Sequence, residues 1–304
     1  MRRSTLWLAA LALDALVGEP PPAIHPVVAA GRLIAALKHR APAAPGAAVR
    51  NGVALVALPV GLALAGGWLA ERLRPAPLRL AATVFLLKSS FALRALIDAG
   101  RRAEAALAQG DPAAARVELA ALVSRPTDTL DEARLASAIV ESLAENLSDS
   151  YVAPLCWYAL GGLPAALAYR VVNTADAMVG YHGRYEYLGK PAARLDDVAN
   201  LVPARLTAAA LVAAAPLAGG SARRALHVLA RDHRRTESPN AGWPMAGAAG
   251  ALGVWLEKPG TYRLGAGGRA PEVDDAAAAR RLVLAAAGIV TLAFVLVDRR
   301  RGRA

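Results

Sequence analysis

The sequence has little of several features that would point to common soluble functions. Its one cysteine, Cys156, lies in an apolar run, which excludes a disulfide framework and a metal site made of cysteine ligands. Aromatic residues are only 5% of the chain, and no recognition motif with interleaved surface aromatics accompanies the net charge of +11, so we expect no nucleic-acid partner. A Walker A loop, a His-Glu-x-x-His motif and a Gly-x-Ser-x-Gly motif are also missing. Any ATP site is therefore of an unusual kind.

What the chain has in abundance is apolar residues, mostly Ala, Leu and Val. They make up 56% of the 304 residues, and the mean hydropathy is +0.34. Length alone would suggest about two soluble domains, and a soluble Ala-rich helical bundle is the alternative interpretation. A bilayer needs about 20 apolar residues per helix, which only the second and third of the six apolar runs reach comfortably. The runs are Leu6–Val17, Val53–Leu73, Leu78–Ile97, Tyr151–Val171, Ala204–Ala218 and Leu282–Val297.

The last run carries no charge and is followed by Arg299 to Arg301, which is typical of a membrane helix and its cytoplasmic flank. We therefore expect an all-α fold: a polytopic helical membrane protein with about four to six apolar segments and amphipathic helices between them. We expect residues 1–304 to form a single integral-membrane domain. Met1–Gly18 has the basic and apolar parts of a signal peptide, but Asp14 interrupts the apolar part, so we interpret it as a retained segment. Basic residues at both ends indicate that both termini face the cytoplasm and that the number of crossings is even.

The stretch from Glu141 to Arg205 concentrates polar residues at helical spacing. In a helix, Glu141, Glu145, Ser148 and Asp149 share one face. Further along, Tyr169, Asn173, Asp176 and Gly180 repeat the arrangement at steps of four, three and four. Polar groups at the edge of an apolar segment cost free energy unless they have partners, so we expect a site here.

Other polar groups occur at the edges of the apolar runs. Asp14, Glu19 and His25 surround a proline-rich turn, where a structural hydrogen bond and a functional role are equally open. Lys88 and Arg94 lie in the third run. Either they extend to the membrane interface, or they face a polyanionic ligand inside the bundle.

Local signals mark further elements. Asp111 with Pro112 predicts a helix start before Ala113–Val123, and Asp131 with Glu132 starts the helix that carries the acidic face. The segment Tyr262–Arg269 is Gly-rich, and we expect a flexible loop there.

Carboxylates, amides and arginines in these segments suit a Mg²⁺–phosphate ligand, because the metal takes carboxylates and the phosphate oxygens take Arg. Asp196 and Asp197 are a plausible Mg²⁺ pair, although adjacent residues on a helix point apart. The basic run around Arg231 precedes Ser238-Pro-Asn-Ala-Gly-Trp-Pro, a rigid turn that could form a phosphate cradle. The residues alone indicate a membrane protein with a polar, phosphate-handling site.

Four blocks of the sequence, in order, resemble one known family. They are LDALVGEPPPAIHPVVAAGRLI, VESLAENLSDSYVAP, YRVVNTADAMVGYHGRYEYLGKPAARLDDVANLVPARLTA and RDHRRTESPNAGWP. The family is the membrane-bound adenosylcobinamide-phosphate synthases of cobalamin biosynthesis, called CobD or CbiB. The resemblance covers nearly the whole chain.

The resemblance implies an ATP- and Mg²⁺-dependent ligase. Family members join the carboxylate of adenosylcobyric acid to the amine of (R)-1-aminopropan-2-ol phosphate, or of unphosphorylated aminopropanol, and release adenosylcobinamide phosphate or adenosylcobinamide. The corrinoid is a substrate and not a cofactor. The implied surroundings are membrane lipid and other enzymes of the corrinoid pathway. The implied location is the inner (cytoplasmic) membrane, with several crossings and the active site facing the cytoplasm.

We assign roles to the residues in these blocks as hypotheses. Catalytic work is expected of Glu141, Glu145, Asn146, Asp149, Asn173 and Asp176. Substrate and phosphate binding is expected of His25, Lys88, Arg94, Arg184, Arg205, Arg231, Asp232, Ser238 and Asn240. Metal binding is expected of Asp196, Asp197 and Asp149.

The chain departs from the family pattern at two positions. Members often carry Gly-Arg-Asp-Thr where this chain has Ser124-Arg125-Pro126-Thr127, and Glu where it has Met245 after Trp-Pro. A metal site built on either carboxylate would be weaker here, or would use a neighbour such as Asp128. The alternative function is a non-enzymatic membrane scaffold, or a corrinoid carrier or transporter, since intramembrane carboxylates also relay protons.

Overall fold

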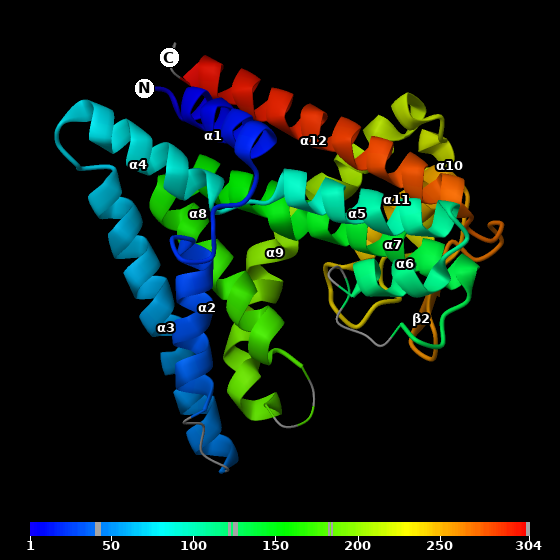
Figure 1. The fold of residues 1–304 in the computed structure, drawn as a ribbon, viewed down its shortest axis with the longest axis horizontal. Coiled ribbons are helices and arrows are strands. Elements are labelled where there is room, and N and C mark those ends of the chain that lie inside the picture. Colours follow the sequence, from blue (N-terminus) through cyan, green and yellow to red (C-terminus); the bar gives the residue numbers. More distant parts are fainter. Residues whose placement is uncertain (40–43, 121–122, 124–126, 182, 184, 302–304) are drawn as a thin grey trace. The chain divides into compact units, whose positions relative to one another are not determined.

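A computed structural model describes residues 1–39, 44–120, 123, 127–181, 183 and 185–301. The described chain is helical apart from one short β-hairpin (Figure 1). Its elements, in order, are α1 (Arg3–Val17), α2 (Pro26–Lys38), α3 (Pro45–Ala70), α4 (Ala76–Lys88), α5 (Leu93–Ala108), α6 (Pro112–Leu119), α7 (Glu132–Leu147), the π-helix η1 (Ser148–Val152), α8 (Ala153–Val179), α9 (Glu186–Ala214), the 3₁₀-helix η2 (Ala215–Ala218), α10 (Ala222–Asp232), α11 (Gly242–Leu252), β1 (Leu256–Lys258), β2 (Tyr262–Leu264) and α12 (Val273–Arg301).

Five helical stretches among the described residues are long and apolar enough to cross a membrane, judged by length and composition. They are Pro45–Ala70, Ala76–Ala108, Glu132–Val179, Glu186–Ala218 and Val273–Arg301. The predicted fold class, a polytopic helical membrane protein, is confirmed. The predicted run Leu6–Val17 is not among the five, because α1 has only 15 residues.

The chain forms two compact units. The first comprises Met1–Ala92, Ala153–Asn200 and Leu296–Ala304, and the second comprises Leu93–Val152 and Leu201–Val295. The expectation of a single domain over residues 1–304 stays a prediction.

In the first unit, α2 and α3 pack on α8. Buried Ile34, Leu55 and Val172 form the centre of one apolar cluster there. Gly67 of α3 lies against Pro164 of α8, where a Cβ atom would meet the backbone of Pro164 at 2.7 Å. The glycine therefore lets the two helices approach closely.

In the second unit, α11 is an almost fully buried helix of small residues, GWPMAGAAGAL. Its Gly250 approaches the backbone of Ala225 on α10, so these two helices also pack closely. The hairpin pairs Leu256 with Leu264 and Lys258 with Tyr262 in an antiparallel register. The expected flexible loop at Tyr262–Arg269 thus begins with a strand, and that expectation is corrected.

Two predicted helices have different bounds. The run Leu78–Ile97 is divided into α4 and α5, because the hydroxyls of Ser89 and Ser90 donate hydrogen bonds to the carbonyls of Phe85 and Leu87 at the end of α4. The expected Ala113–Val123 helix is α6, which ends at Leu119. The predicted starts are confirmed, since the Asp111 and Asp131 carboxylates accept hydrogen bonds from the backbone N–H groups of Ala114 and Arg134.

Candidate functional site

The second unit contains a polar cavity of about 220 Å³ that brings together residues far apart in the sequence. Glu141 and Glu145 line it from α7, and Ser238 lines it from the turn before α11. The hairpin contributes Lys258 and Tyr262. Two of the blocks singled out in the sequence therefore meet in one cavity.

Glu141 is fixed at this cavity through both of its carboxylate oxygens. The Ser137 hydroxyl donates to Oε1 at 2.8 Å, and the Tyr262 hydroxyl donates to Oε2 at 3.0 Å. The Ser137 oxygen in turn accepts the backbone N–H of Glu257 at 2.9 Å. These bonds attach the hairpin to α7, so the position of Glu141 depends on β1 and β2.

The charges lining the cavity are mainly negative. Among the residues that the structure describes, Glu141, Glu145 and Glu237 line it together with one cation, Lys258. Carboxylates with nearby hydroxyls suit a hard divalent cation, and Mg²⁺ usually takes one or two carboxylates plus substrate oxygens. Nowhere in the described part of the chain do three or more His, Cys, Asp or Glu side chains form a group that could hold a metal ion by themselves. The residues present fit a cation that a phosphate ligand helps to hold.

The turn that carries Ser238 is held by its own polar groups. The Thr236 hydroxyl donates to the Ser238 carbonyl at 2.8 Å, and the Asn240 N–H donates to the Ser238 hydroxyl at 3.2 Å. The Arg205 guanidinium donates to the Asn240 side-chain oxygen at 3.0 Å and lies 4.6 Å from the Trp243 ring centroid. The predicted residues Arg205, Ser238 and Asn240 are thus close together.

Asp232, at the end of α10, is completely buried and is the centre of another cluster. The Arg231 guanidinium donates to both of its oxygens at 2.8 and 2.7 Å, Arg235 is paired with it at 2.9 Å, and the Gly265 N–H donates to it at 2.8 Å. Burial raises the pKa of Asp232, but the bonds and charges from Arg231, Gly265 and Arg235 outweigh burial, so this pKa lies below its usual value. Asp232 thus holds Arg231 and Gly265 in place, and its expected role in substrate binding stays a prediction.

The first unit holds a separate amide and carboxylate cluster on α8 and α9. The Asn173 amide donates to Asp196 Oδ1 at 3.3 Å, and the Asn200 amide donates to Asp196 Oδ2 at 2.9 Å. The carboxylates of Asp196 and Asp197 interact electrostatically with the carboxyl group of Asp176. Three of the residues expected to bind metal or move protons therefore lie together with Asn173. Arg170 donates to the Asn173 oxygen at 3.0 Å and supplies a positive charge.

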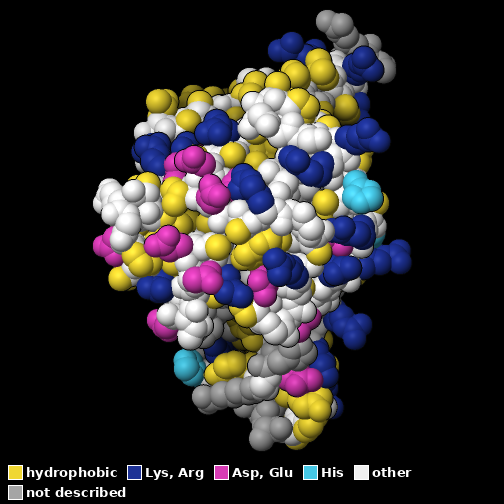
Figure 2. Space-filling model, turned by 90° about the vertical axis from the view of Figure 1, so that its right-hand side faces the viewer, with side chains coloured by type: hydrophobic (Ala, Val, Ile, Leu, Met, Phe, Trp, Pro, Cys, Tyr) yellow, Lys and Arg dark blue, Asp and Glu magenta, His cyan; other side chains and the backbone are white. Residues whose placement is uncertain are grey.

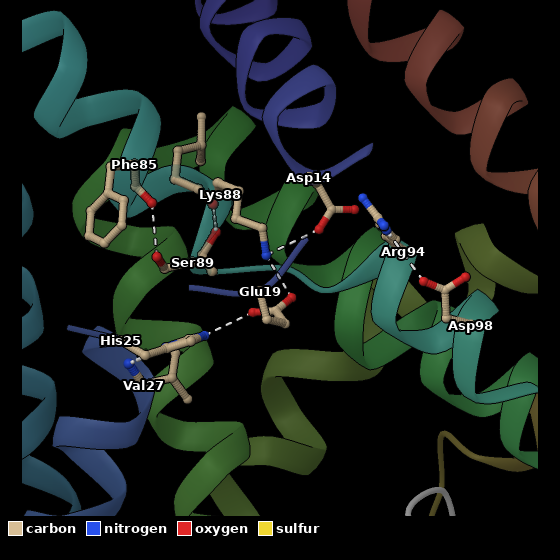
Figure 3. A network of polar contacts seen from close by, with 11 residues as sticks. Asp14, Glu19, His25, Val27, Phe85, Lys88, Ser89, Arg94 and Asp98 are labelled. Atoms are coloured by element: carbon tan, nitrogen blue, oxygen red, sulfur yellow. Dashed lines mark hydrogen bonds and ion pairs between the residues drawn. The ribbon is translucent and has the colours of Figure 1, made fainter. Parts of the chain in front are cut away.

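A second polar network in the first unit connects α1, α2 and α4 (Figure 3). The Lys88 side chain is 1% exposed, and its ammonium lies 3.1 Å from Asp14 and 2.6 Å from Glu19. His25 is hydrogen-bonded to Glu19 at 2.9 Å. Burial raises the pKa of Glu19, but His25 and Lys88 together lower it below its usual value. Lys88 therefore faces two carboxylates, and its expected role with phosphate stays a prediction.

The remaining predicted residues lie as follows. Arg94 forms a surface ion pair with Asp98 on α5. The Asn146 amide donates to the Ser142 carbonyl within α7, at 2.9 Å. Asp149 lies in η1, so the π-helix interrupts the single face expected for Glu141 to Asp149. Arg184 lies outside the described residues.

Comparisons with known proteins identify the family. The sequence model of the family described as "CobD/Cbib protein" matches residues 7–288. The chain is 43% identical over 265 residues to the cobalamin biosynthesis protein CobD of Dehalococcoides mccartyi, covering 86% of each chain. It is 42% identical over 269 residues to the probable cobalamin biosynthesis protein CobD of Methanothermobacter thermautotrophicus, covering 87% of this chain and 88% of that one.

The chain belongs to the CobD/CbiB family. The probable cobalamin biosynthesis protein CobD of Pyrococcus furiosus is 40% identical over 291 residues and covers 95% of each chain. No solved structure matches the chain.

One of the two departures from the family pattern lies at the cavity. Met245 is 1% exposed and lines the cavity, and its sulfur lies 3.6 Å from the Tyr262 hydroxyl oxygen. A carboxylate expected at this position in the CobD/CbiB family would therefore add to the acidic lining. The other departure, Pro126, lies outside the described residues, whereas its neighbour Asp128 is exposed.

The sequence did not predict several residues of the Glu141 cavity and of the cluster around Asp196. Asn200 follows Asp196 by four residues, so helical spacing could have revealed it. The hairpin residues Lys258, Thr261 and Tyr262 gave no comparable signal, because their strands are only three residues long.

Proposed function

We propose that this CobD/CbiB chain acts in cobalamin biosynthesis as an ATP- and Mg²⁺-dependent amide ligase. Its substrates would be adenosylcobyric acid and (R)-1-aminopropan-2-ol phosphate, or aminopropanol, and its product adenosylcobinamide phosphate or adenosylcobinamide. The protein would act in the inner (cytoplasmic) membrane with its active site facing the cytoplasm. Membrane lipid and other corrinoid-pathway enzymes would be its neighbours.

The observation that carries the proposal is the cavity formed by α7, the turn at Ser238 and the hairpin. Among the described residues it has three carboxylates, one ammonium group and several hydroxyls around one space, in a chain of this family. Amide formation from a carboxylate needs the same set of groups. Cationic groups must stabilise charge on the activated acyl group, and a base must accept a proton from the attacking amine.

Within that cavity we assign the proton acceptor to Glu145. Glu141 is fixed through both oxygens by Ser137 and Tyr262, which suits a group that orients a ligand. Glu145 lines the same cavity one helical turn further along α7. Lys258 also lines the cavity, and its ammonium group would attract phosphate oxygens.

In the reaction, a substrate carboxylate oxygen attacks ATP and takes its γ-phosphoryl group, which releases ADP, or its adenylyl group, which releases pyrophosphate. The acyl phosphate or acyl adenylate formed then carries phosphate or AMP as its leaving group. The amine nitrogen then forms the C–N bond, the C–O bond to the activated oxygen breaks, and Glu145 takes the proton lost by nitrogen. Mg²⁺, when bound, supplies positive charge that neutralises phosphate oxygens. Glu141 in the second unit, or Asp176 with Asp196 in the first, are the carboxylates that would hold it.

The test is an assay on purified protein in detergent, supplied with adenosylcobyric acid, aminopropanol phosphate, Mg²⁺ and ATP, with corrinoid products resolved by mass. We expect product that requires both protein and ATP. Glu145→Gln should lower the rate by about 10²–10⁴-fold, the usual range for loss of a general base. Glu186→Gln is the matched control, because Glu186 does not line the cavity and its partly exposed side chain pairs with Lys190.

A folded protein that binds the corrinoid but forms no product with either amine would refute the ligase. That result would favour the scaffold or carrier. Product that is unaffected by Glu145→Gln would keep the ligase and move the proton acceptor elsewhere.

A further inference from the structure

A second cavity in the second unit, of about 540 Å³, shares no lining residue with the cavity of Glu141. Its charged lining is basic: Arg224, His227 and Arg231 from α10, and Arg269 from the segment after the hairpin. No Asp or Glu stands among the described residues that line it. On the face drawn in Figure 2, which looks onto the side where α10 is labelled in Figure 1, Lys and Arg side chains are prominent.

The three guanidinium groups are held in place by partners outside the cavity lining or by backbone. Arg231 donates to Asp232 at 2.8 and 2.7 Å, and Arg269 donates to Asp275 at 2.6 and 2.7 Å. Arg224 donates to the carbonyls of Gly250 and Ala251 at the end of α11, at 2.8 and 3.3 Å. Each guanidinium has five N–H donors, so these bonds orient it and leave donors for a ligand.

The rest of the lining is a glycine-rich turn, Gly265-Ala-Gly-Gly268, which follows β2. Gly265 and Gly267 have backbone φ values of 67° and 93°, which residues other than glycine rarely adopt. The turn is held by the Gly268 N–H donating to the Gly265 carbonyl at 2.9 Å and the Arg269 N–H donating to the Gly253 carbonyl at 3.2 Å. Glycine-rich turns of this kind can form concave anion sites in proteins, because no Cβ blocks the approach of a ligand to the backbone.

Asp232 connects the two halves of this cavity. It binds the Arg231 guanidinium on α10 and the Gly265 N–H at the start of the turn. The basic helix face and the glycine-rich turn are therefore fixed against each other before any ligand binds. Such a preformed site avoids the entropic cost of ordering its groups on binding.

We propose that this cavity binds a phosphate-bearing anion through its phosphate oxygens. Guanidinium groups and a glycine-rich turn are the combination that recognises planar or tetrahedral oxyanions. The volume falls within the range of small-molecule sites, so the phosphate can carry an organic group. The phosphate belongs either to a soluble compound or to a lipid headgroup. The inference does not depend on the proposed ligase reaction, because binding is measured without turnover.

The test inserts one negative charge into the cavity. Ala266 is exposed, lines the cavity and has a backbone conformation open to any side chain. Ala266→Glu and Ala266→Gln add side chains of nearly the same size, and only the first adds charge. With inorganic pyrophosphate as probe and titration calorimetry on detergent-solubilised full-length protein, we expect Ala266→Glu to weaken binding about tenfold or more, because like charges a few ångströms apart repel. Ala266→Gln should stay within about twofold of the unaltered protein.

Two further variants provide a control and a second test. Arg223→Gln removes one positive charge from α10 at a residue that does not line the cavity, and it should leave pyrophosphate binding unchanged. His227→Gln changes an exposed lining residue and covers the case in which Ala266→Glu fails to fold. It should weaken pyrophosphate binding severalfold, because it replaces a side chain that lines the cavity.

A second arm identifies the source of the phosphate. The thermal midpoint is measured in detergent doped with phosphatidylglycerol and, separately, with phosphatidylcholine. A rise specific to phosphatidylglycerol that Ala266→Glu abolishes, without pyrophosphate binding, assigns the site to lipid headgroups. Pyrophosphate binding that Ala266→Glu weakens assigns it to soluble phosphates. If Ala266→Glu and Ala266→Gln behave alike in both arms, the proposal is wrong.

Discussion

At the scale of single residues, Asp232 is a buried charge that connects several parts of the second unit. Its side chain is 0% exposed, and it joins two arginines to the backbone of Gly265. Replacing it with Asn keeps the size but removes the charge. Hydrogen bonds to a charged group contribute about 1.5–3 kcal/mol each, so we expect Asp232→Asn to lower the free energy of unfolding by ~2 kcal/mol at neutral pH.

The same residue gives a pH dependence with a defined sign. The pKa of Asp232 is lower in the folded protein than its usual value of about 3.9. A carboxyl group of this kind stabilises the fold fully above its unfolded pKa, and the contribution is lost as the pH falls through the folded pKa. The difference in thermal midpoint between the unaltered protein and Asp232→Asn should therefore be constant from pH 7 to about 5 and shrink below about 4. A difference that stays constant down to pH 3 would contradict this assignment.

The sequence predicts which polar residues line a site more readily than it predicts which residues they contact. The spacing of Glu141 and Glu145 predicted a shared helix face, and both do line one cavity. Lys88 was expected at a membrane interface or near a polyanion, yet it binds Asp14 and Glu19. These partners are about 70 residues away along the chain, so helix packing decides the contact and no local pattern encodes it.

At the scale of whole elements, α8 is broken near its middle, and two charged residues satisfy the break. Gly162 has a φ of 71°, and Pro164 follows it. Arg3 donates to the carbonyls of Tyr158, Ala159 and Leu160, the nearest at 2.7 Å. The Glu71 carboxylate accepts the Leu163 N–H at 3.1 Å. These backbone groups near the break are thus hydrogen-bonded to side chains, which avoids the cost of leaving them without partners.

This arrangement makes Glu71 a cap for the second half of α8. Removing a side-chain cap costs about 1 kcal/mol. We expect Glu71→Ala to lower the free energy of unfolding by about that amount, whereas Glu71→Gln should lose much less because its amide oxygen still accepts the Leu163 N–H. The measurement is thermal unfolding in detergent. Equal losses for the two substitutions would mean that the carboxylate charge, and not the acceptor, stabilises the break.

Helix starts were predictable where a capping residue in the local sequence marks them. Asp111 and Asp131 cap α6 and α7 as expected, since an N-cap needs only its own segment. The division of the third apolar run was not predicted, because Ser89 and Ser90 look like ordinary members of an apolar helix. The hairpin was missed because three-residue strands have too little alternation to detect, and their stability comes from contacts with α7.

At the scale of the whole molecule, the two units divide the predicted chemistry. Glu141, Glu145 and Ser238 belong to the second unit, and Asn173, Asp176 and Asp196 belong to the first. Each group is connected within its own unit, by the hydrogen bonds to Glu141 in one and to Asp196 in the other. Mutations in either group should therefore be interpreted within their own unit.

The two ends of the chain constrain the membrane topology. The Ser4 N–H donates to the Asp298 carboxylate at 3.0 Å, and both residues belong to the first unit (Figure 1). Residues 4 and 298 are therefore on the same side of any membrane that the chain crosses, so the number of crossings between them is even. Five helical stretches in the described parts of the chain are candidates, by length and composition. Hence either one of the five does not cross, or another segment crosses as well.

The lone cysteine makes this testable by labelling. In a Cys156→Ala background, single cysteines at Arg2 and Arg300 would be probed in intact cells with a maleimide that does not cross membranes. We expect the two positions to react alike, and both to be protected until the membrane is opened, because the arginines at each end favour the cytoplasmic side. Labelling of one position but not the other in intact cells would require an odd number of crossings, which the contact between Ser4 and Asp298 does not allow.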